Sequence, residues 1–336
     1  MIIKNISLVN FRNHSSYQLK CNPDTTLIIG QNGCGKTSVL EAIYILTRGK
    51  SFRSTDPEII KHNTDFYRIE IEFDNGNKYT TTYDGKNKKF IILDKKTARL
   101  PAKQKYPIVL FLPSDLNLIS GSPSRHRDYF DHLFSQLSEE YNSIINKYNK
   151  SLRQRNELLK SEQLSSSSLF SWNLLLAKYG TTIFKLRQEF INNINQKINQ
   201  TYYSIAKNND EIELKYQTEV KDISESSYLK ILEQNFQKDL YLGHTTFGIH
   251  RDDFEFIFNH RPANGSASRG ETRSIILALK FIEADLMYEK LHQKPIVLLD
   301  DVFSELDEVR RKCLVENFKN HQVIITSVEK IDLVND

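Results

Sequence analysis

The chain has 336 residues, of which 39% are hydrophobic, and it contains only 12 glycines and 8 prolines. This composition excludes a disordered or fibrous protein and supplies a core for two ordinary domains, or for one large domain with an insertion. The formal net charge of +4 permits a nucleic-acid partner without requiring one.

The cysteines and the apolar pattern bear on where the protein works. Cys21, Cys34 and Cys313 lie far apart and form no CxxC pair, which disfavours a disulfide framework or a zinc site and fits a reducing compartment. The first residues, MIIKNISLVNFRNH, alternate between apolar and polar side chains and do not resemble a signal peptide. No apolar run approaches the roughly 18 residues of a membrane span. We therefore expect a soluble, cytoplasmic protein without a membrane partner.

The first part of the chain has the pattern of an α/β domain. Hydrophobic periodicity predicts strands over 2–11 and 25–29, a helix over 36–49, an antiparallel meander over 65–93 and a strand over 108–112. The meander contains two turn signals, Asn75-Gly76 and Asp84-Gly85.

The middle of the chain is helical. Apolar residues recur three or four apart over 124–162 and again over 172–205, and the serine run Ser165 to Ser168 separates the two stretches. Two long helices joined by a short polar loop predict an antiparallel helical arm. Two ordinary helices of a bundle would give the same pattern, and this alternative stays open.

After residue 240 the α/β pattern resumes. It predicts strands over 254–258, 296–299 and 323–326, with a helix from about Gly270. The helical segment therefore reads as an insertion that splits one α/β domain. We expect an N-terminal half of the α/β domain over 1–123, a helical arm domain over 124–240 and a C-terminal half of the α/β domain over 241–336.

The segment after the second strand fits the phosphate-binding P-loop, GxxxxGK[ST]. Its glycines let backbone N–H groups turn inward around an anion, and the helix that follows directs its positive end at the phosphates. Lys36 is expected to reach the β- and γ-phosphates, and the Thr37 hydroxyl to ligate Mg²⁺. The expected ATP contacts are Gly30, Gln31, Asn32, Gly33, Cys34, Gly35, Lys36, Thr37 and Ser38.

The apolar run Ile296 to Leu299 ends in two carboxylates, Asp300 and Asp301. The carboxyl ends of strands are where open α/β sheets bind ligands. Asp300 is expected to hold Mg²⁺ as a Walker B residue does, and Asp301 to polarise the attacking water as a general base. An aspartate that ends a strand is often only a turn residue, but the P-loop upstream favours the catalytic interpretation.

A small polar stretch, Ser266 to Glu271, opens the predicted helix before the Asp300 strand. Ser268 fits a helix N-cap. The position of the stretch resembles the signature motif of ABC-type ATPases, and Ser304 to Asp307 matches their D-loop. That resemblance implies that Ser268, Arg269 and Gly270 contact the nucleotide held by a second subunit, with Ser268 acting beside Lys36 and Asp301 in catalysis.

Several blocks along the chain resemble the RecF family of bacterial recombination and repair ATPases, in the family's order. They are NFRNH at 10–14, SFR at 51–53, PSDLNLISGSPSRHRDYFD at 113–131, YNKSLRQRNELLK at 148–160, GIHRDDF at 248–254, SRGETRSIILALK at 268–280 and IVLLDDVFSELD at 296–307. Three positions depart from the family pattern: Thr272 replaces a glutamine, Ile249 a proline, and Asp128 one residue of a basic run.

The resemblance implies a fold and a function. The fold would be an ABC-type P-loop ATPase head with an antiparallel β meander and an inserted helical arm. The protein would bind DNA at single-strand gaps and single/double-strand junctions and help RecR and RecO load RecA, in DNA replication maintenance and the SOS response. ATP and Mg²⁺ would drive formation of a homodimer, and a weak, DNA-stimulated ATP hydrolysis would release the DNA.

A basic run supports a DNA partner. Residues 85–105 hold eight Lys or Arg and one Asp, a net charge of +7, which is enough to contact several phosphates. Lysines that defend a solvated sheet edge give the same pattern, so both interpretations stay open. The candidates in this run are Lys86, Lys88, Lys89, Lys95, Lys96 and Arg99, and weaker candidates on the arm are Lys147, Lys150, Arg153 and Arg155.

Three other classes of protein share part of this pattern. The ATP-binding subunit of a membrane transporter has the same site but a shorter insertion, and an SMC-type clamp has a far longer coiled coil. A P-loop kinase or GTPase leaves the signature and D-loop stretches unexplained. The segment His250 to Asp253 fits either chemistry or fastening of the sheet, and we favour fastening.

Overall fold

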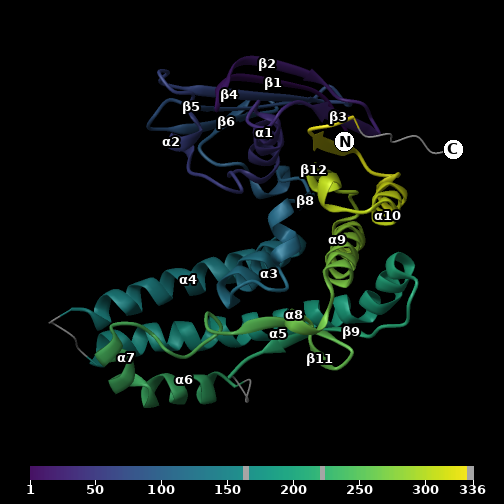
Figure 1. Ribbon diagram of the computed structural model, residues 1–336. Coiled ribbons are helices and arrows are strands. Elements are labelled where there is room, and N and C mark those ends of the chain that lie inside the picture. The colour runs from purple at the N-terminus through teal and green to yellow at the C-terminus, as the bar shows by residue number, and fades with distance from the viewer. Residues whose placement is uncertain (162–165, 220–223, 331–336) are drawn as a thin grey trace. The chain divides into compact units, whose positions relative to one another are not determined.

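The computed structural model describes residues 1–161, 166–219 and 224–330 (Figure 1). The chain forms two compact units, one made of Met1–Leu116 and the chain from Glu283 on, the other of Asn117–Ile282. This division differs from the expected domain boundaries, because residues 241–282 pack with the helical segment. The long helix α9 (Arg269–Leu291) contains the boundary between the units.

The first unit contains a six-stranded antiparallel sheet. Its strands follow the order β2-β1-β4-β5-β6-β7, and β7 lies at one edge. The predicted meander over 65–93 corresponds to β4, β5 and β6, whereas β2 was not predicted. The bounds are β1 (Ile3–Phe11), β2 (His14–Lys20), β4 (Tyr67–Phe73), β5 (Lys78–Tyr83), β6 (Lys88–Ile92) and β7 (Lys95–Thr97).

A four-stranded parallel sheet completes the first unit, in the order β3-β13-β12-β8. Its strands are short and apolar, as expected for strands covered on both faces. Their parallel pairing brings the carboxyl ends of β3 and β12 to one edge of the sheet. The bounds are β3 (Thr25–Ile29), β8 (Ile108–Phe111), β12 (Ile296–Asp300) and β13 (Val323–Ser327).

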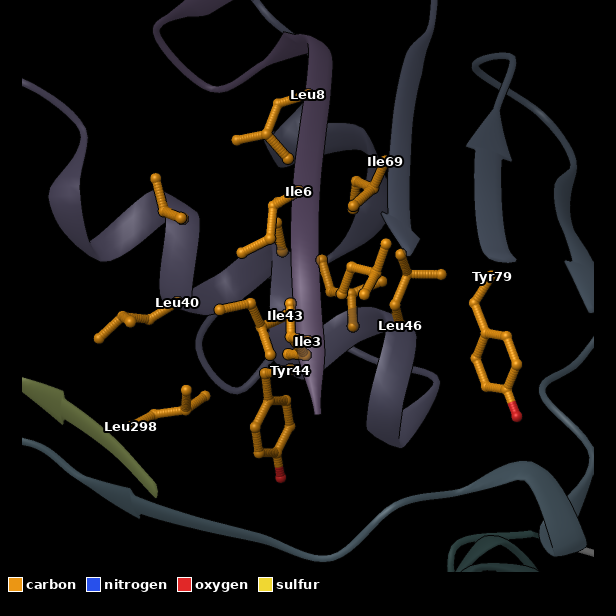
Figure 2. Packing of buried hydrophobic residues seen from close by; sticks show 14 of the residues in the cluster. Ile3, Ile6, Leu8, Leu40, Ile43, Tyr44, Leu46, Ile69, Tyr79 and Leu298 are labelled. Carbon is orange, nitrogen blue, oxygen red and sulfur yellow. The ribbon is translucent and has the colours of Figure 1, made fainter. Parts of the chain in front are cut away.

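Helix α1 (Lys36–Arg48) packs against strands of both sheets. Eleven of its 13 residues are buried, because apolar side chains surround it on nearly every face. Figure 2 shows Leu40 and Ile43 of α1 gathered with side chains of β1, β4 and β12. This packing fixes the P-loop, which enters α1 directly. The unit also holds α2 (Asp56–Ile59) and α10 (Glu308–Phe318), with single turns η1 (Ala102–Gln104) and η3 (Val302–Glu305). The turn η2 (Pro113–Asn117) ends at the first residue of the second unit.

The second unit combines helices with a three-stranded sheet in the order β11-β10-β9. Helices α4 and α5 lie side by side (Figure 1), and α5 also packs against α6 and β9. The arm is therefore part of a packed unit rather than an isolated coiled coil. The bounds are α3 (Pro123–Leu137), α4 (Glu139–Leu159), α5 (Ser166–Ala206), β9 (Ile212–Gln217), α6 (Glu225–Gln234), α7 (Phe236–Leu242), β10 (Asp253–Phe258), β11 (Arg261–Pro262) and α8 (Ala263–Ser266).

The helix predicted over 124–162 is two helices. Ser138 has extended backbone angles (φ −144°, ψ 120°), ends α3, and accepts a hydrogen bond from the Tyr141 N–H as the N-cap of α4. The separation expected at Ser165 to Ser168 lies earlier in the chain, since α4 ends at Leu159 and α5 begins at Ser166; Ser165 itself lies outside the described residues.

Buried charges hold the second unit together. The side chains of Arg155 and Asp239 are both fully buried and form an ion pair of 2.8 Å, and Arg155 also donates to Asn173 and Thr245. Arg155 was considered above as a weak DNA candidate, and that interpretation is wrong, because the side chain faces the interior. Lys147, Lys150 and Arg153 are exposed.

The GIHRDDF block also lies within these contacts. His250 Nδ1 lies 2.8 Å from the Tyr148 hydroxyl, and Nε2 lies 3.1 Å from the Thr245 carbonyl oxygen. Asp252 accepts a hydrogen bond from the Tyr216 hydroxyl. Asp253 lies 2.7 Å from His126 Nδ1. These partners come from α4, β9 and α3, which agrees with the fastening role favoured above.

In the described part of the chain no helix is long and apolar enough to cross a bilayer.

Candidate nucleotide-binding site

The P-loop joins β3 to α1, in the strand–loop–helix setting that phosphate binding requires. Gly33 and Gly35 have φ of +82° and +101°, angles that other residues adopt only with strain. At Gly35 a Cβ atom would also collide with the side chains of Asn13 and His14. The loop conformation therefore depends on glycine at these two positions.

Lys36 and Thr37 occupy the first turn of α1. The Lys36 ammonium donates to the carbonyl oxygens of Gly30 and Gln31, at 2.6 and 3.1 Å, so the side chain curls back over the loop. The Thr37 hydroxyl donates to the Asp300 carboxylate at 2.8 Å. The structure thus brings together the two expected Mg²⁺ ligands, which lie 263 positions apart in the chain.

Asp300 and Asp301 follow the buried strand β12. The Thr326 hydroxyl, on the neighbouring strand β13, donates to Asp300 at 2.8 Å and fixes that carboxylate. Asp301 leaves the strand with a φ of +51°, and its N–H donates to the Thr326 carbonyl oxygen at 3.1 Å. Burial raises the pKa of Asp301, the Asp300 carboxylate raises it further, and Lys36 opposes the shift. A raised pKa suits a group that takes up a proton.

These residues line one pocket of the first unit. It contains most of the expected P-loop contacts and both aspartates, together with residues that the sequence did not single out as ligand contacts. Its lining residues are Arg12, Asn13, Asn32, Gly33, Gly35, Lys36, Thr37, Ser38, Arg53, Glu58, Ile60, Lys61, His62, Asp300 and Asp301.

The turn between β1 and β2 is the main feature that sequence reasoning missed. Asn13 donates to the Gly33 carbonyl oxygen at 3.0 Å, and His14 Nε2 lies 3.2 Å from that of Gly35. Lys61 donates to the Asn13 carbonyl oxygen at 3.0 Å. This turn therefore holds the P-loop through the carbonyl oxygens of Gly33 and Gly35. Its signal was the NFRNH block, which carried the family resemblance but received no role.

The signature stretch belongs to the second unit and opens α9. Ser268 and Glu271 form a capping box, in which the Ser268 N–H donates to the Glu271 carboxylate at 2.6 Å and the Glu271 N–H donates to the Ser268 hydroxyl at 3.3 Å. Ser268 and Arg269 are exposed and Gly270 is partly exposed. The expected N-cap role of Ser268 is confirmed.

The D-loop stretch follows the aspartates directly. The Ser304 hydroxyl donates to the Asp301 carbonyl oxygen at 2.7 Å, which connects the stretch to the second of the two aspartates. Asp307 accepts from the Arg310 N–H at 2.9 Å as the N-cap of α10.

The basic run covers β6, β7 and the turns beside them. Lys86, Lys89, Lys95, Lys96 and Arg99 are exposed. Lys88 differs from them. Its ammonium forms an ion pair of 2.7 Å with Asp56, and its side chain is only 13% exposed, so it fastens β6 to α2. Strand β7 lies at the edge of the sheet, where lysines also serve to prevent pairing with a strand of another chain.

Comparison with known proteins places the chain in a family. A family model described as an AAA ATPase domain matches residues 1–332. The DNA replication and repair protein RecF of Clostridioides difficile strain 630 is 34% identical over 345 aligned residues, covering 98% of this chain and 92% of that protein. The chain belongs to the RecF family.

The likeness to RecF extends to the fold. A solved structure of the recombination mediator protein RecF with ATP, from the RecFOR pathway, has a TM-score of 0.88 at 30% identity and covers 99% of this chain and 93% of its own. An SMC head bound to the C-terminal winged-helix domain of ScpA has a TM-score of 0.54 at 14% identity, covers 99% of this chain and 90% of its own, and so supports the fold alone. The predicted α/β P-loop ATPase head and the predicted RecF family are both confirmed.

Proposed function

We propose that this member of the RecF family is an ATP-dependent DNA-binding protein that acts in recombinational repair. The observation that carries the proposal is the pocket that joins the P-loop to Thr37, Asp300 and Asp301. The proteins it resembles are a DNA replication and repair protein and a recombination mediator with bound ATP.

The pocket's own groups divide the work of binding and hydrolysis. Backbone N–H groups of the P-loop and the start of α1 face the phosphates, and Lys36 supplies a cation for the β- and γ-phosphates. Asp301 accepts a proton from the attacking water, for which its raised pKa fits it.

Thr37 and Asp300 fit a Mg²⁺ site by their chemistry. A hydroxyl oxygen and a carboxylate oxygen are hard donors of the kind that Mg²⁺ prefers, and here they already lie within hydrogen-bond distance of each other. Bound Mg²⁺ would neutralise phosphate charge during hydrolysis. Thr326 holds Asp300 in the orientation that this role needs.

The second half of the ATP site is proposed to come from another copy of the chain. Ser268, Arg269 and Gly270 lie at an accessible helix start, where a serine hydroxyl and backbone N–H groups suit a phosphate. ATP would then join two heads into a dimer, and slow hydrolysis would separate them. The domain roles follow: an ATPase head in two sequence segments and a helical arm inserted between them.

The DNA contacts are proposed for the exposed members of the basic run, which are Lys86, Lys89, Lys95, Lys96 and Arg99. Their positive charge suits contacts with DNA phosphates, which fix a protein on the duplex and carry no sequence information. The DNA would be a single-strand gap or a single/double-strand junction, where the protein helps RecR and RecO load RecA during replication maintenance and the SOS response.

DNA stimulation of ATP hydrolysis tests this function. We expect hydrolysis to rise with gapped duplex and to rise less with blunt duplex of equal length, and we expect Lys36→Ala to abolish both. Replacing Lys95 and Lys96 by glutamate should weaken DNA binding and its dependence on salt, while ATP binding by the free protein stays unchanged. If no DNA of any structure changes the hydrolysis rate, the proposed function is wrong.

A further inference from the structure

Two sequence blocks that the proposed function leaves unused meet at one buried carboxylate. Arg12, from the NFRNH block, and Arg53, from the SFR block, both form ion pairs with Glu41, at 2.7 and 2.8 Å. Glu41 lies on α1, one helical turn after Ser38, and its side chain is fully buried. The two blocks therefore meet at a residue of α1, the helix that follows the P-loop.

Each arginine binds Glu41 through two nitrogens. For Arg12 the Nε and Nη2 contacts are 2.9 and 2.7 Å, and for Arg53 they are 3.1 and 2.8 Å. The Ser51 hydroxyl donates to the same carboxylate at 2.6 Å. Paired contacts of this kind fix the plane of a guanidinium group as well as its position. Glu41 thus sets the orientation of both arginines.

The cluster carries surplus positive charge. Burial alone would raise the pKa of Glu41, but hydrogen bonds from Arg12, Arg53 and Ser51 outweigh that effect and lower it. Glu41 is therefore ionised at neutral pH and neutralises only one of the two arginines. Arg12 also donates to the Glu58 carbonyl oxygen at 2.9 Å and to the Ser54 hydroxyl at 2.6 Å, but these acceptors are uncharged, so the cluster keeps one net positive charge for an anionic partner.

The geometry directs this charge into the nucleotide pocket. Arg12 and Arg53 both line it together with Lys36 and Thr37, and their side chains are 21% and 38% exposed, whereas Glu41 is 0% exposed. Guanidinium groups are suited to binding phosphate oxygens in a fixed plane. The turn that presents Arg12 is strained, with a φ of +52° at Asn10 and of +56° at Arg12, which is common where function requires a particular backbone.

We propose that Glu41 is a positioning residue that holds Arg12 and Arg53 as a second phosphate-binding element of the pocket. The ligand is a phosphate group of the nucleoside triphosphate, bound beside the phosphates that the P-loop holds. This inference rests on the proposed function, because it concerns the same pocket. It assigns the NFRNH and SFR blocks to nucleotide binding.

Titration of the full chain with ATP and Mg²⁺ tests the inference. Arg53→Gln should weaken ATP binding at least about tenfold, as expected for loss of a hydrogen bond to a charged group. Glu41→Gln should weaken it to a similar extent, and Glu41→Asp by less. The double variant should lose less than the product of the two single effects, because Glu41 acts through Arg53. Arg68→Gln removes a surface arginine of the same unit and should bind like the unchanged protein.

Two results would overturn the inference. Unchanged ATP affinity in Arg53→Gln means that the arginine does not reach the nucleotide. Independent, multiplying effects of Glu41→Gln and Arg53→Gln mean that Glu41 acts on the helix and not through the arginine. If Glu41→Gln does not fold, Glu41→Asp is measured in its place. Unchanged ATP affinity in Glu41→Asp means that Glu41 does not position the arginines for the nucleotide.

The same titration separates this inference from the proposed function. If the unchanged protein does not bind ATP, both the function and the inference fail. If it binds ATP, loses binding in Lys36→Ala, and keeps full affinity in the Glu41 and Arg53 variants, only the inference fails.

Discussion

His250 should make the second unit sensitive to mild acid. Burial, aided by Arg251 and Arg127, lowers the pKa of this histidine from 6.5 to about 4, although the Thr245 carbonyl oxygen and Asp239 oppose the shift. The neutral ring fits its contacts, since one nitrogen donates to the Thr245 carbonyl oxygen while the other accepts from the Tyr148 hydroxyl. The folded protein therefore resists protonation at a pH where the unfolded chain accepts it.

The sign and size follow from proton linkage. As the pH falls through 6.5 the unfolded chain binds a proton, whereas the folded protein binds one only near pH 4. The stabilisation is thus complete above pH 6.5 and is lost progressively down to about pH 4. Between pH 7 and pH 5 the loss amounts to about 2 kcal/mol, from 1.36 kcal/mol for each pKa unit.

Urea unfolding at pH 7 and pH 5 measures this loss. Trp172, the single tryptophan of the chain, lies on α5 in the same unit, so its fluorescence reports the unit that contains His250. His250→Gln keeps a donor and an acceptor but cannot titrate, and it should reduce the pH effect by about 2 kcal/mol. His260→Gln removes an exposed histidine of the same unit and should not. An equal loss of stability in His250→Gln and in the unchanged protein would refute the reasoning.

Three further predictions concern the site and the buried ion pair. Thr37→Ala should weaken ATP binding in the presence of Mg²⁺ and change it little when Mg²⁺ is chelated, which titration under both conditions measures. Asp301→Asn should keep ATP binding but slow hydrolysis by about a hundredfold or more. Because the pKa of Asp301 is raised, hydrolysis by the unchanged protein should fall as the pH drops through that pKa, and the variant should lack this response. Arg155→Ala should destabilise the second unit by about 3–5 kcal/mol, because Asp239 would remain buried without its partner. Urea unfolding followed by Trp172 fluorescence measures this change, and a much smaller drop in the free energy of unfolding would mean that the ion pair is unimportant.

The sequence predicted the parts of the site that obey local rules. The P-loop needs glycines, a lysine and a hydroxyl at fixed spacing, and the structure places that loop between a strand and a helix as expected. Asp300 was assigned from the strand before it, and in the structure it ends β12 and accepts a hydrogen bond from Thr37. Such features depend on neighbours in the chain, so a linear pattern reveals them.

Other features depend on contacts between distant segments. Arg155 continues the three-to-four spacing of the buried residues Tyr148, Ser151 and Leu159, whereas Arg153 does not, but the partner that stabilises a buried arginine, Asp239, lies far along the chain. Lys88 resembles its neighbours in the basic run until Asp56 is seen beside it. The role of Glu41 likewise appears only when two remote arginines meet it.

Some misses did have a local signal. Ser138 stands before two glutamates, which is the pattern of an N-cap with an acidic first turn, and it marks the break between α3 and α4. Strand β9 was not predicted either, although it alternates Ile212, Leu214 and Tyr216, which is the pattern of a half-buried strand.

Sedimentation velocity with and without ATP tests the central claim most directly, namely that the pocket is half of a site completed by a second copy. We predict a monomer without ATP and a dimer with ATP and Mg²⁺. Ser268→Arg should bind ATP as tightly as the unchanged monomer and yet remain monomeric. If the unchanged protein stays monomeric when saturated with ATP, or if Ser268→Arg forms the dimer as readily, the composite site is contradicted.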